Sequence, residues 1–169
     1  MESNLTSEEI KIEEIKDLEF LKTVRSECAV YLNKNELILC YENKLYKISK
    51  DDFDYMTYNT YIGGFFENNV KKLAYDAKNL IFELKKEGVE VKNISDDVML
   101  MAYVLNPISQ NYSLRELCAF YLSKQTKDDV DAVLYMHNLR DKLSQLLKIS
   151  EGEYVYREIE LKLTYVLAD

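Results

Sequence analysis

Apolar residues form short continuous runs in the first third of the chain, and helical periods dominate afterwards. The run Cys28–Leu32 is apolar at every position, which is typical of a central strand covered on both faces. Two more runs of strand length follow at 36–41 and 44–48, with Glu42-Asn43 between them as a hairpin turn. The pattern predicts three consecutive antiparallel strands, preceded by an edge strand at 10–15 and a short helix at 18–24.

The middle of the chain alternates between strand and helix. We expect a helix at 51–69 whose end is made irregular by Gly63-Gly64. A strand at 70–75, a helix from Asp76 to Gly88 and a strand at 89–94 then form a crossover unit. Such units join parallel strands, so the sequence predicts an α/β fold with a mixed sheet of about five strands, three antiparallel and then two parallel, flanked by helices.

The last part of the chain is predicted to be mainly helical. Ser95-Asp96-Asp97 would start a helix that runs to Leu105 and stops before Pro107, and Ser113 with Glu116 forms a capping box for a helix at 114–122. Apolar residues at helical spacing predict a long helix over 128–147. A final amphipathic helix should begin near Tyr154 and run to Asp169.

Composition indicates one globular domain. Of 169 residues, 47% are hydrophobic and 31% charged, and the formal net charge is -8, which disfavours strong phosphate binding by this domain alone. Three separated cysteines, Cys28, Cys40 and Cys118, favour reduced core thiols over disulfides or a zinc site. We therefore expect a monomeric, cytoplasmic protein with no membrane segment, divided into a polar tail (1–9), a domain (10–150) and the start of a further helix (151–169).

Candidate chemistry rests on carboxylates. His137 is the only histidine and lies within a predicted helix, where a packing or surface role is the simpler interpretation. Asp76 follows a predicted strand at the edge where α/β folds form crevices. Asp128 and Asp129 begin a helix. Taken by spacing alone, all three residues are better explained as helix caps.

Five segments in the same order resemble the 3′-to-5′ exonuclease domain of bacterial DNA polymerase I, which has a ribonuclease H-like fold. They are Lys72–Leu80, Ile94–Pro107, Tyr112–Leu122, Asp128–His137 and Glu158–Asp169. The last segment resembles the entry into the polymerase domain. The resemblance implies a covalently attached polymerase domain, with DNA contacted through that parent protein and weakly or not at all by this domain.

Active members of that family hydrolyse phosphodiesters with two Mg²⁺ ions held by four carboxylates. Asp76 and Asp129 match two of them, but Tyr31 and Asn33 stand where the first strand supplies Asp and Glu. Gln125 replaces a water-orienting Tyr, and Lys72 replaces an Asn sometimes present before the second motif. The resemblance therefore implies a vestigial exonuclease domain with no functional metal pair and no cofactor of its own, acting structurally beside a DNA-synthesising polymerase.

Two alternative functions are also considered. An active Mg²⁺-dependent proofreading exonuclease could use a divergent ligand set, with Glu27 and Glu36 joining Asp76 and Asp129. A non-enzymatic interaction module could instead present the aromatic segment Phe53–Phe66 as an exposed patch. A packing role for those rings is the simpler expectation.

Overall fold

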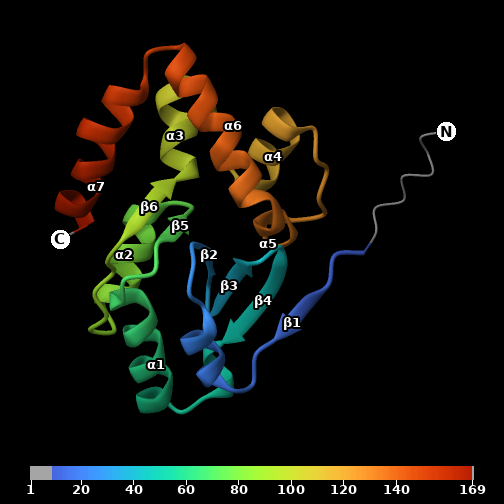
Figure 1. Cartoon of the computed structure of the whole chain (residues 1–169), viewed down its shortest axis with the longest axis vertical. Coiled ribbons are helices and arrows are strands. Elements are labelled where there is room, and N and C mark those ends of the chain that lie inside the picture. The colour runs from blue at the N-terminus through green and yellow to red at the C-terminus, as the bar shows by residue number, and fades with distance from the viewer. Residues whose placement is uncertain (1–8, 169) are drawn as a thin grey trace.

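A computed structural model describes residues 9–168 as a six-stranded mixed sheet between two helical layers (Figure 1). All but the last residue of the expected polar tail, and Asp169, lie outside the described residues. The strands follow the spatial order β1-β4-β3-β2-β5-β6. Their bounds are β1 (Ile12–Glu14), β2 (Cys28–Asn33), β3 (Glu36–Tyr41), β4 (Lys44–Ser49), β5 (Lys72–Ala74) and β6 (Ile94–Asp97).

The predicted strand pairing is confirmed. Strands β2, β3 and β4 are antiparallel neighbours, β5 pairs in parallel with β2, and β6 pairs in parallel with β5. The edge strand β1 pairs in parallel with β4 and brings the count to six. Glu42 and Asn43 both have positive φ, at 51° and 62°, as a two-residue type I′ hairpin turn requires.

Helices cover both faces of the sheet. On one face lie the 3₁₀ helix η2 (Leu18–Thr23), α1 (Tyr55–Glu67) and α2 (Ala77–Lys85), and they enclose one core cluster with Val30, Leu37 and Leu39. On the other face lie α3 (Val98–Leu105), α4 (Leu114–Leu122) and α6 (Met136–Ile149), around Ala29, Ile38 and Leu73. Side chains along β2 and β3 point alternately to the two faces of the sheet, so these strands contribute residues to two separate cores.

The prediction of an irregular helix end at Gly63-Gly64 is wrong. Helix α1 continues regularly through both glycines to Glu67. Its buried face carries Tyr58, Ile62, Phe65 and Phe66, and burial of these large side chains outweighs a helix cost of roughly 1 kcal/mol per glycine. The same burial favours the packing role for this aromatic segment, although Tyr55 at its start is exposed.

The second parallel strand begins later than predicted. Residues 89–93 are not strand, although Val89 and Val91 are buried, and β6 runs over Ile94–Asp97. Asn93 has a positive φ of 62° just before the strand, which places the turn later than the apolar pattern indicated. Consequently Asp97 ends the strand and caps α3, and the helix expected from Ser95 begins at Val98.

The long helix expected over 128–147 is divided. A short helix α5 (Asp129–Ala132) and a 3₁₀ turn η4 (Val133–Tyr135) precede α6. This turn lets the consecutive residues Ala132 and Val133 both be fully buried, which one straight amphipathic face does not favour. The 3₁₀ turn η3 (Lys50–Asp52) precedes α1, and the last predicted helix consists of a π-helical segment η5 (Val155–Glu160) followed by α7 (Leu161–Ala168).

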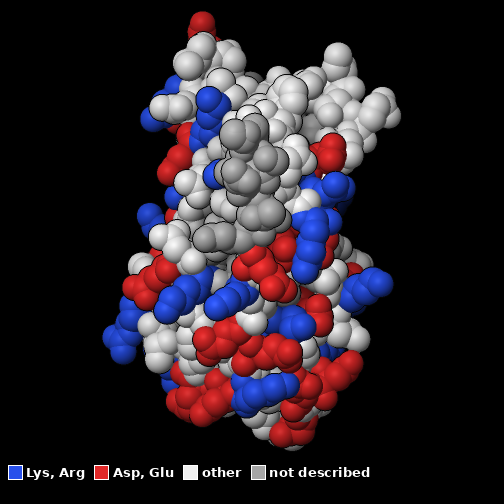
Figure 2. Space-filling view, turned by 90° about the vertical axis from the view of Figure 1, so that its right-hand side faces the viewer, with Lys and Arg blue, Asp and Glu red and all other residues white. Residues whose placement is uncertain are grey.

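Other local expectations hold. Ser113 Oγ accepts a hydrogen bond from the Glu116 amide at 3.3 Å and caps α4. All three cysteines are free and buried. On the face shown in Figure 2, acidic and basic side chains are interspersed over the half of the molecule that holds β1 and β4. Among residues 9–168, none of the helices has the length and apolar character needed to cross a bilayer.

Candidate functional site

Parallel pairing brings the ends of β2 and β5 to one edge of the sheet. Val30 pairs with Ala74, so Tyr31 and Tyr75, the next residue on each chain segment, are neighbours. Their ring centroids lie 5.5 Å apart. Tyr75 Oη donates to the Tyr112 carbonyl at 2.7 Å and ties this edge to the loop before α4. The aromatic pair lies at the edge where, by the resemblance, active members of the family hold their metal ions.

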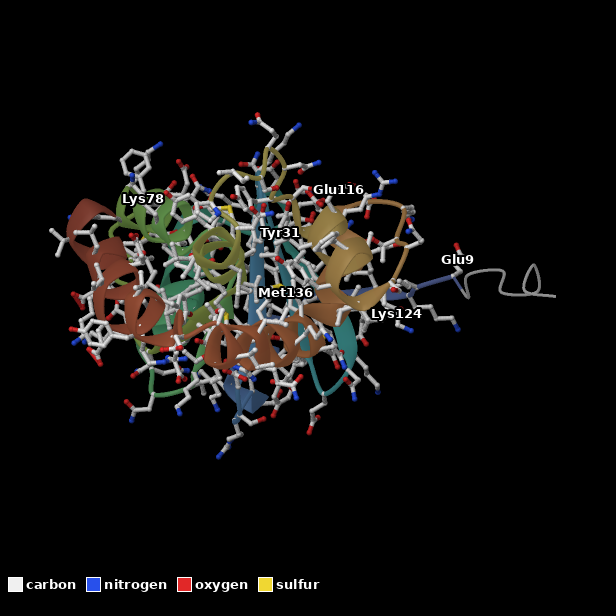
Figure 3. The ribbon with its side chains drawn as sticks, turned by 90° about the horizontal axis from the view of Figure 1, so that it is seen from above. Glu9, Tyr31, Lys78, Glu116, Lys124 and Met136 are labelled. Atoms are coloured by element: carbon white, nitrogen blue, oxygen red, sulfur yellow. The ribbon has the colours of Figure 1, made fainter. Side chains whose placement is uncertain are left out.

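Tyr31 and Asp129 are brought into direct contact. Tyr31 Oη donates a hydrogen bond to Asp129 Oδ2 at 3.2 Å, while Asp129 Oδ1 accepts from the Arg115 backbone amide at 2.8 Å. Burial first, and then the negative charge of Asp129, raises the pKa of Tyr31, so its phenol stays protonated as a donor at neutral pH. In the view of Figure 3, Tyr31 lies over β2 between helix α2, marked by Lys78, and helix α4, marked by Glu116.

Asp76 lies at the same edge and caps α2. Its backbone is left-handed, with φ 59° and ψ 62°, and its side chain accepts from the Asn79 amide at 3.3 Å. Asp tolerates this conformation better than most residues, since its short polar side chain bonds locally. The carboxylate of Asp76 therefore performs the capping role that spacing alone indicated.

Sequence reasoning missed Asp97. Its buried carboxylate accepts from the backbone amides of Asp76 (3.0 Å) and Ala77 (2.8 Å) at the start of α2, and also from those of Met99 (3.0 Å) and Leu100 (3.3 Å) at the start of α3. Burial raises the pKa of Asp97 to about 6. The signal was an Asp directly before an apolar helix, but the helix was expected to start at Ser95, three residues before its observed start at Val98. One carboxylate thus fixes two helix termini and the left-handed backbone of Asp76.

The other positions singled out by resemblance take no part in the Tyr31–Asp129 hydrogen bond and have partners or surroundings of their own. Asn33 Nδ2 donates to Glu36 Oε1 at 3.4 Å. Gln125 is exposed in the segment between α4 and α5. Lys72 is fully buried on the other face of the sheet, where Nζ donates to the carbonyls of Phe66 and Asn68 and to Asn68 Oδ1.

The two acidic residues of the divergent ligand set have other partners. Glu27 precedes β2 at its amino end, and Arg140 donates to both of its carboxylate oxygens at 2.8 and 2.9 Å. Burial alone would raise the pKa of Glu27, but hydrogen bonds from Arg140 and Ser95 hold it below its usual value. Glu36 lies 3.6 Å from Lys47 Nζ. Glu27, with Asp96 and Arg140, lines a separate pocket of about 660 Å³.

His137 lies beside Glu27, one of the residues that line this pocket. Its Nε2 lies 3.7 Å from Glu27 Oε1, and burial lowers the pKa of the imidazole. No hydrogen bond or ion pair joins it to Asp76 or Asp129 within residues 9–168. This placement agrees with a packing role for the histidine.

This chain is similar in sequence to a known protein and in fold to two solved structures. DNA polymerase I of Caldicellulosiruptor bescii is 31% identical over 107 residues, which are 60% of this chain and 12% of that protein. Two solved structures share the fold: the POL domain of Pol1 from M. smegmatis in complex with DNA primer-template and dNTP, and the catalytic core of RRP6 from Trypanosoma brucei. The first has a TM-score of 0.69 and 19% identity, covering 83% of this chain and 27% of that one. The second has a TM-score of 0.67 and 16% identity, covering 93% of this chain and 53% of that one.

The family comparison covers the central part of the domain. The model of the DNA polymerase I, ribonuclease H-like domain matches residues 38–135, more than half of the 169 residues. The match includes Asp76 and Asp129 and begins after Tyr31 and Asn33. Together with the sheet order and the relative in C. bescii, it shows that this chain belongs to the family of ribonuclease H-like domains of DNA polymerase I.

Proposed function

We propose that this chain is a catalytically silent 3′-to-5′ exonuclease-like domain that acts structurally within a DNA-synthesising polymerase. The observation that carries the proposal is the hydrogen bond from Tyr31 Oη to Asp129 Oδ2. A neutral phenol occupies the position where the resemblance expects a metal-bridging carboxylate. It also engages one of the two acidic residues that remain.

The donor set at this edge supports the proposal, because it does not fit a pair of divalent cations. Mg²⁺ requires several anionic oxygen ligands in near-octahedral geometry. Each oxygen of Asp129 already accepts a hydrogen bond, and the Asp76 carboxylate caps α2. Within residues 9–168, the acidic, histidine and cysteine side chains form no group of three that could hold a metal ion.

The two remaining carboxylates have structural roles that explain their presence without catalysis. Asp76 satisfies a free amide at the start of α2, and Asp129 links β2 through Tyr31 to the first turn of α4 through the Arg115 amide. Replacing an N-cap Asp by Ala costs about 1 kcal/mol. Stability alone therefore supplies a physical reason for Asp at both positions.

The role of the whole protein is part of the same proposal. This chain spans 12% of the C. bescii relative, which is named DNA polymerase I. We infer a covalently attached polymerase domain that carries the DNA contacts, in a monomeric cytoplasmic protein. The net charge of -8 supports weak or absent DNA binding by this domain alone.

A nuclease assay tests the proposal directly. The purified chain is incubated with 5′-labelled single-stranded DNA in Mg²⁺ and then Mn²⁺, beside an Asp76→Ala/Asp129→Ala double variant. We expect intact substrate in every lane. Shortening by the unmodified chain alone would overturn the silent-domain proposal and would favour the active exonuclease with divergent ligands.

A further inference from the structure

A polar pocket of about 660 Å³ lies at the amino ends of the parallel strands, and we call it the amino-edge pocket. Glu27 precedes β2, Lys71 precedes β5, and Ile94 begins β6. Because these strands run in the same direction, the pocket lies at the edge of the sheet opposite Tyr75, which follows β5, and Asp97, which ends β6. Its volume is in the range of small-molecule sites, roughly 300–1,000 Å³.

Charged side chains dominate the lining of the amino-edge pocket. Three cations and two carboxylates are among its eight lining residues: Lys71, Arg140, Arg157, Glu27 and Asp96. The whole chain has a formal net charge of -8, so an excess of cations sets this pocket apart from the average of the molecule. A concave site with such an excess attracts negatively charged ligands.

The two carboxylates of the pocket already have partners within the domain. Arg140 donates to both oxygens of Glu27 and, at 3.3 Å, to Asp96 Oδ2. Asp96 Oδ1 accepts from the phenol of Tyr156 at 2.8 Å. The side chains of Glu27, Asp96 and Arg140 are at most 21% exposed. Each carboxylate oxygen is therefore engaged, and the acidic side of the pocket is not open to a cationic ligand.

The donors that remain open belong to Arg157 and Lys71. The Arg157 side chain is 42% exposed, and its only hydrogen bond found within residues 9–168 runs from Nη2 to Asp96 Oδ1 at 3.1 Å. Its guanidinium lies 5.2 Å from the ring centroid of Tyr156, which is fully buried. Lys71 is exposed, and in the described part of the chain no hydrogen bond or ion pair of its ammonium is found. Two cations thus face the pocket with donors to spare.

Arg157 is held in position before any ligand arrives. It belongs, with Tyr156, to the π-helical segment η5, and such turns are rare and often lie at functional sites. In this turn the two consecutive side chains donate to the same oxygen, Asp96 Oδ1. A cation that is already ordered loses little side-chain freedom on binding, and this lowers the cost of association.

We propose that the amino-edge pocket binds a phosphate monoester group, with Arg157 and Lys71 as the residues that hold it. Such a group carries a charge of about −2 at neutral pH and presents three acceptor oxygens. Two open cations balance that charge, and the planar fork of an arginine matches phosphate oxygens. A carboxylate ligand carries half of the charge and has fewer acceptors. Asn93 and Ile94, which also line the pocket, border the organic group that the phosphate esterifies.

Nuclear magnetic resonance of the isotope-labelled 169-residue chain tests the site. Inorganic phosphate, ribose 5-phosphate and acetate are titrated separately at constant pH and ionic strength. We expect both phosphates to give saturable shifts of the Ile94 and Ser95 amides and of the Arg157 Nε–H, with acetate binding more weakly than either. Acetate that binds as tightly as phosphate, or phosphate shifts that never saturate, would overturn the proposal.

Variants assign the two cations. Arg157→Gln should weaken ribose 5-phosphate binding at least about tenfold, because a charge-assisted hydrogen bond to phosphate is lost. Lys71→Gln should weaken it as well, and since the Lys71 side chain is exposed, this variant tests the site without disturbing the fold. Lys78→Gln is the matched control, because Lys78 is exposed on α2 and does not line the pocket. An equal loss of affinity in Lys71→Gln and Lys78→Gln would contradict a specific site.

A short single-stranded oligothymidylate, with and without a 5′-phosphate, distinguishes two sources of the group. Tighter binding of ribose 5-phosphate than of either strand would assign the pocket to a small phosphorylated molecule. Tighter binding of the 5′-phosphorylated strand would assign it to the end of a nucleic acid. Equal saturable shifts of the pocket amides by both strands would show binding along the nucleic-acid backbone and would overturn the monoester site. None of these results bears on DNA cleavage at the opposite edge of the sheet.

Discussion

The phenol of Tyr31 donates to the carboxylate of Asp129 at 3.2 Å and joins β2 to α5 across 98 positions of sequence. Asp129 in turn accepts from the Arg115 amide of α4. The contact thus links the sheet to two helical elements at the edge where family members bind metal. Tyr31 thus supplies a packing and hydrogen-bonding connection at the position where the proposed function places a lost metal ligand.

Replacing Tyr31 by Phe should lower the free energy of unfolding by about 1 kcal/mol, because one partly buried hydrogen bond to a carboxylate is lost while the ring remains. Urea denaturation monitored by circular dichroism measures the difference. Tyr103→Phe is the control, since the Tyr103 side chain is 45% exposed and no hydrogen bond of its hydroxyl is found within residues 9–168. Equal stability of the two variants would show that the Tyr31–Asp129 bond contributes nothing.

Restoring the first motif tests the proposed loss of the metal site. A Tyr31→Asp/Asn33→Glu variant would place four carboxylates at this edge, and their mutual repulsion should lower the melting temperature without metal. Mg²⁺ or Mn²⁺ should then raise the melting temperature of this variant and not that of the unmodified chain, because only the variant binds the ions in its folded state. Adding Asp76→Ala to the restored variant should abolish the gain. A metal response of the unmodified chain equal to that of the variant would contradict the proposed loss.

The architecture was predictable because the decisive signals are local. The apolar run at Cys28–Leu32, the turn Glu42-Asn43 and the crossover around Asp76 fix strand order and direction through period and turn chemistry. The cap at Asp76 was also predictable, since Asp before a helical apolar pattern has few other common roles. These features depend on residues close together in the chain.

The errors arose where long-range packing decided the local structure. The pattern Val89–Val91 resembles a strand, but both residues are buried outside the sheet, and pairing with β5 begins at Ile94. That shift hid the role of Asp97, whose four amide donors come from two helices. The contact between Tyr31 and Asp129 likewise depends on the position of α5 relative to β2, which no local pattern contains.

Asp97→Asn should destabilise the domain by about 2–4 kcal/mol, because one carboxylate oxygen that accepts backbone amides is replaced by an NH₂ donor facing them in a buried site. Asp128→Asn is a matched control, since Asp128 also caps a helix, by accepting from the Asp131 amide at 2.9 Å, and Asn serves nearly as well as Asp at an N-cap. Chemical denaturation of both variants gives the comparison. If Asp97→Asn lowers the free energy of unfolding no more than Asp128→Asn does, the Asp97 carboxylate does not stabilise the starts of α2 and α3 as proposed.

Burial of Lys72 predicts that the stability of the domain depends on pH in the alkaline range. Its fully buried ammonium donates to carbonyl and amide oxygens of Phe66 and Asn68, and burial lowers its pKa from 10.5 to about 8. Between about pH 8 and 10.5 Lys72 is protonated in the unfolded chain and neutral in the folded chain. The contribution of Lys72 to the free energy of unfolding therefore rises with pH across this window, and it is constant below the window. The difference in unfolding free energy between the unmodified chain and Lys72→Met should therefore increase by on the order of 3 kcal/mol from pH 7.5 to 10.5. Urea titrations at several pH values measure it, with Lys71→Met at the exposed neighbouring position as the control for loss of one positive charge. A difference that stays flat across this window would show that the oxygens around Lys72 compensate fully for its burial.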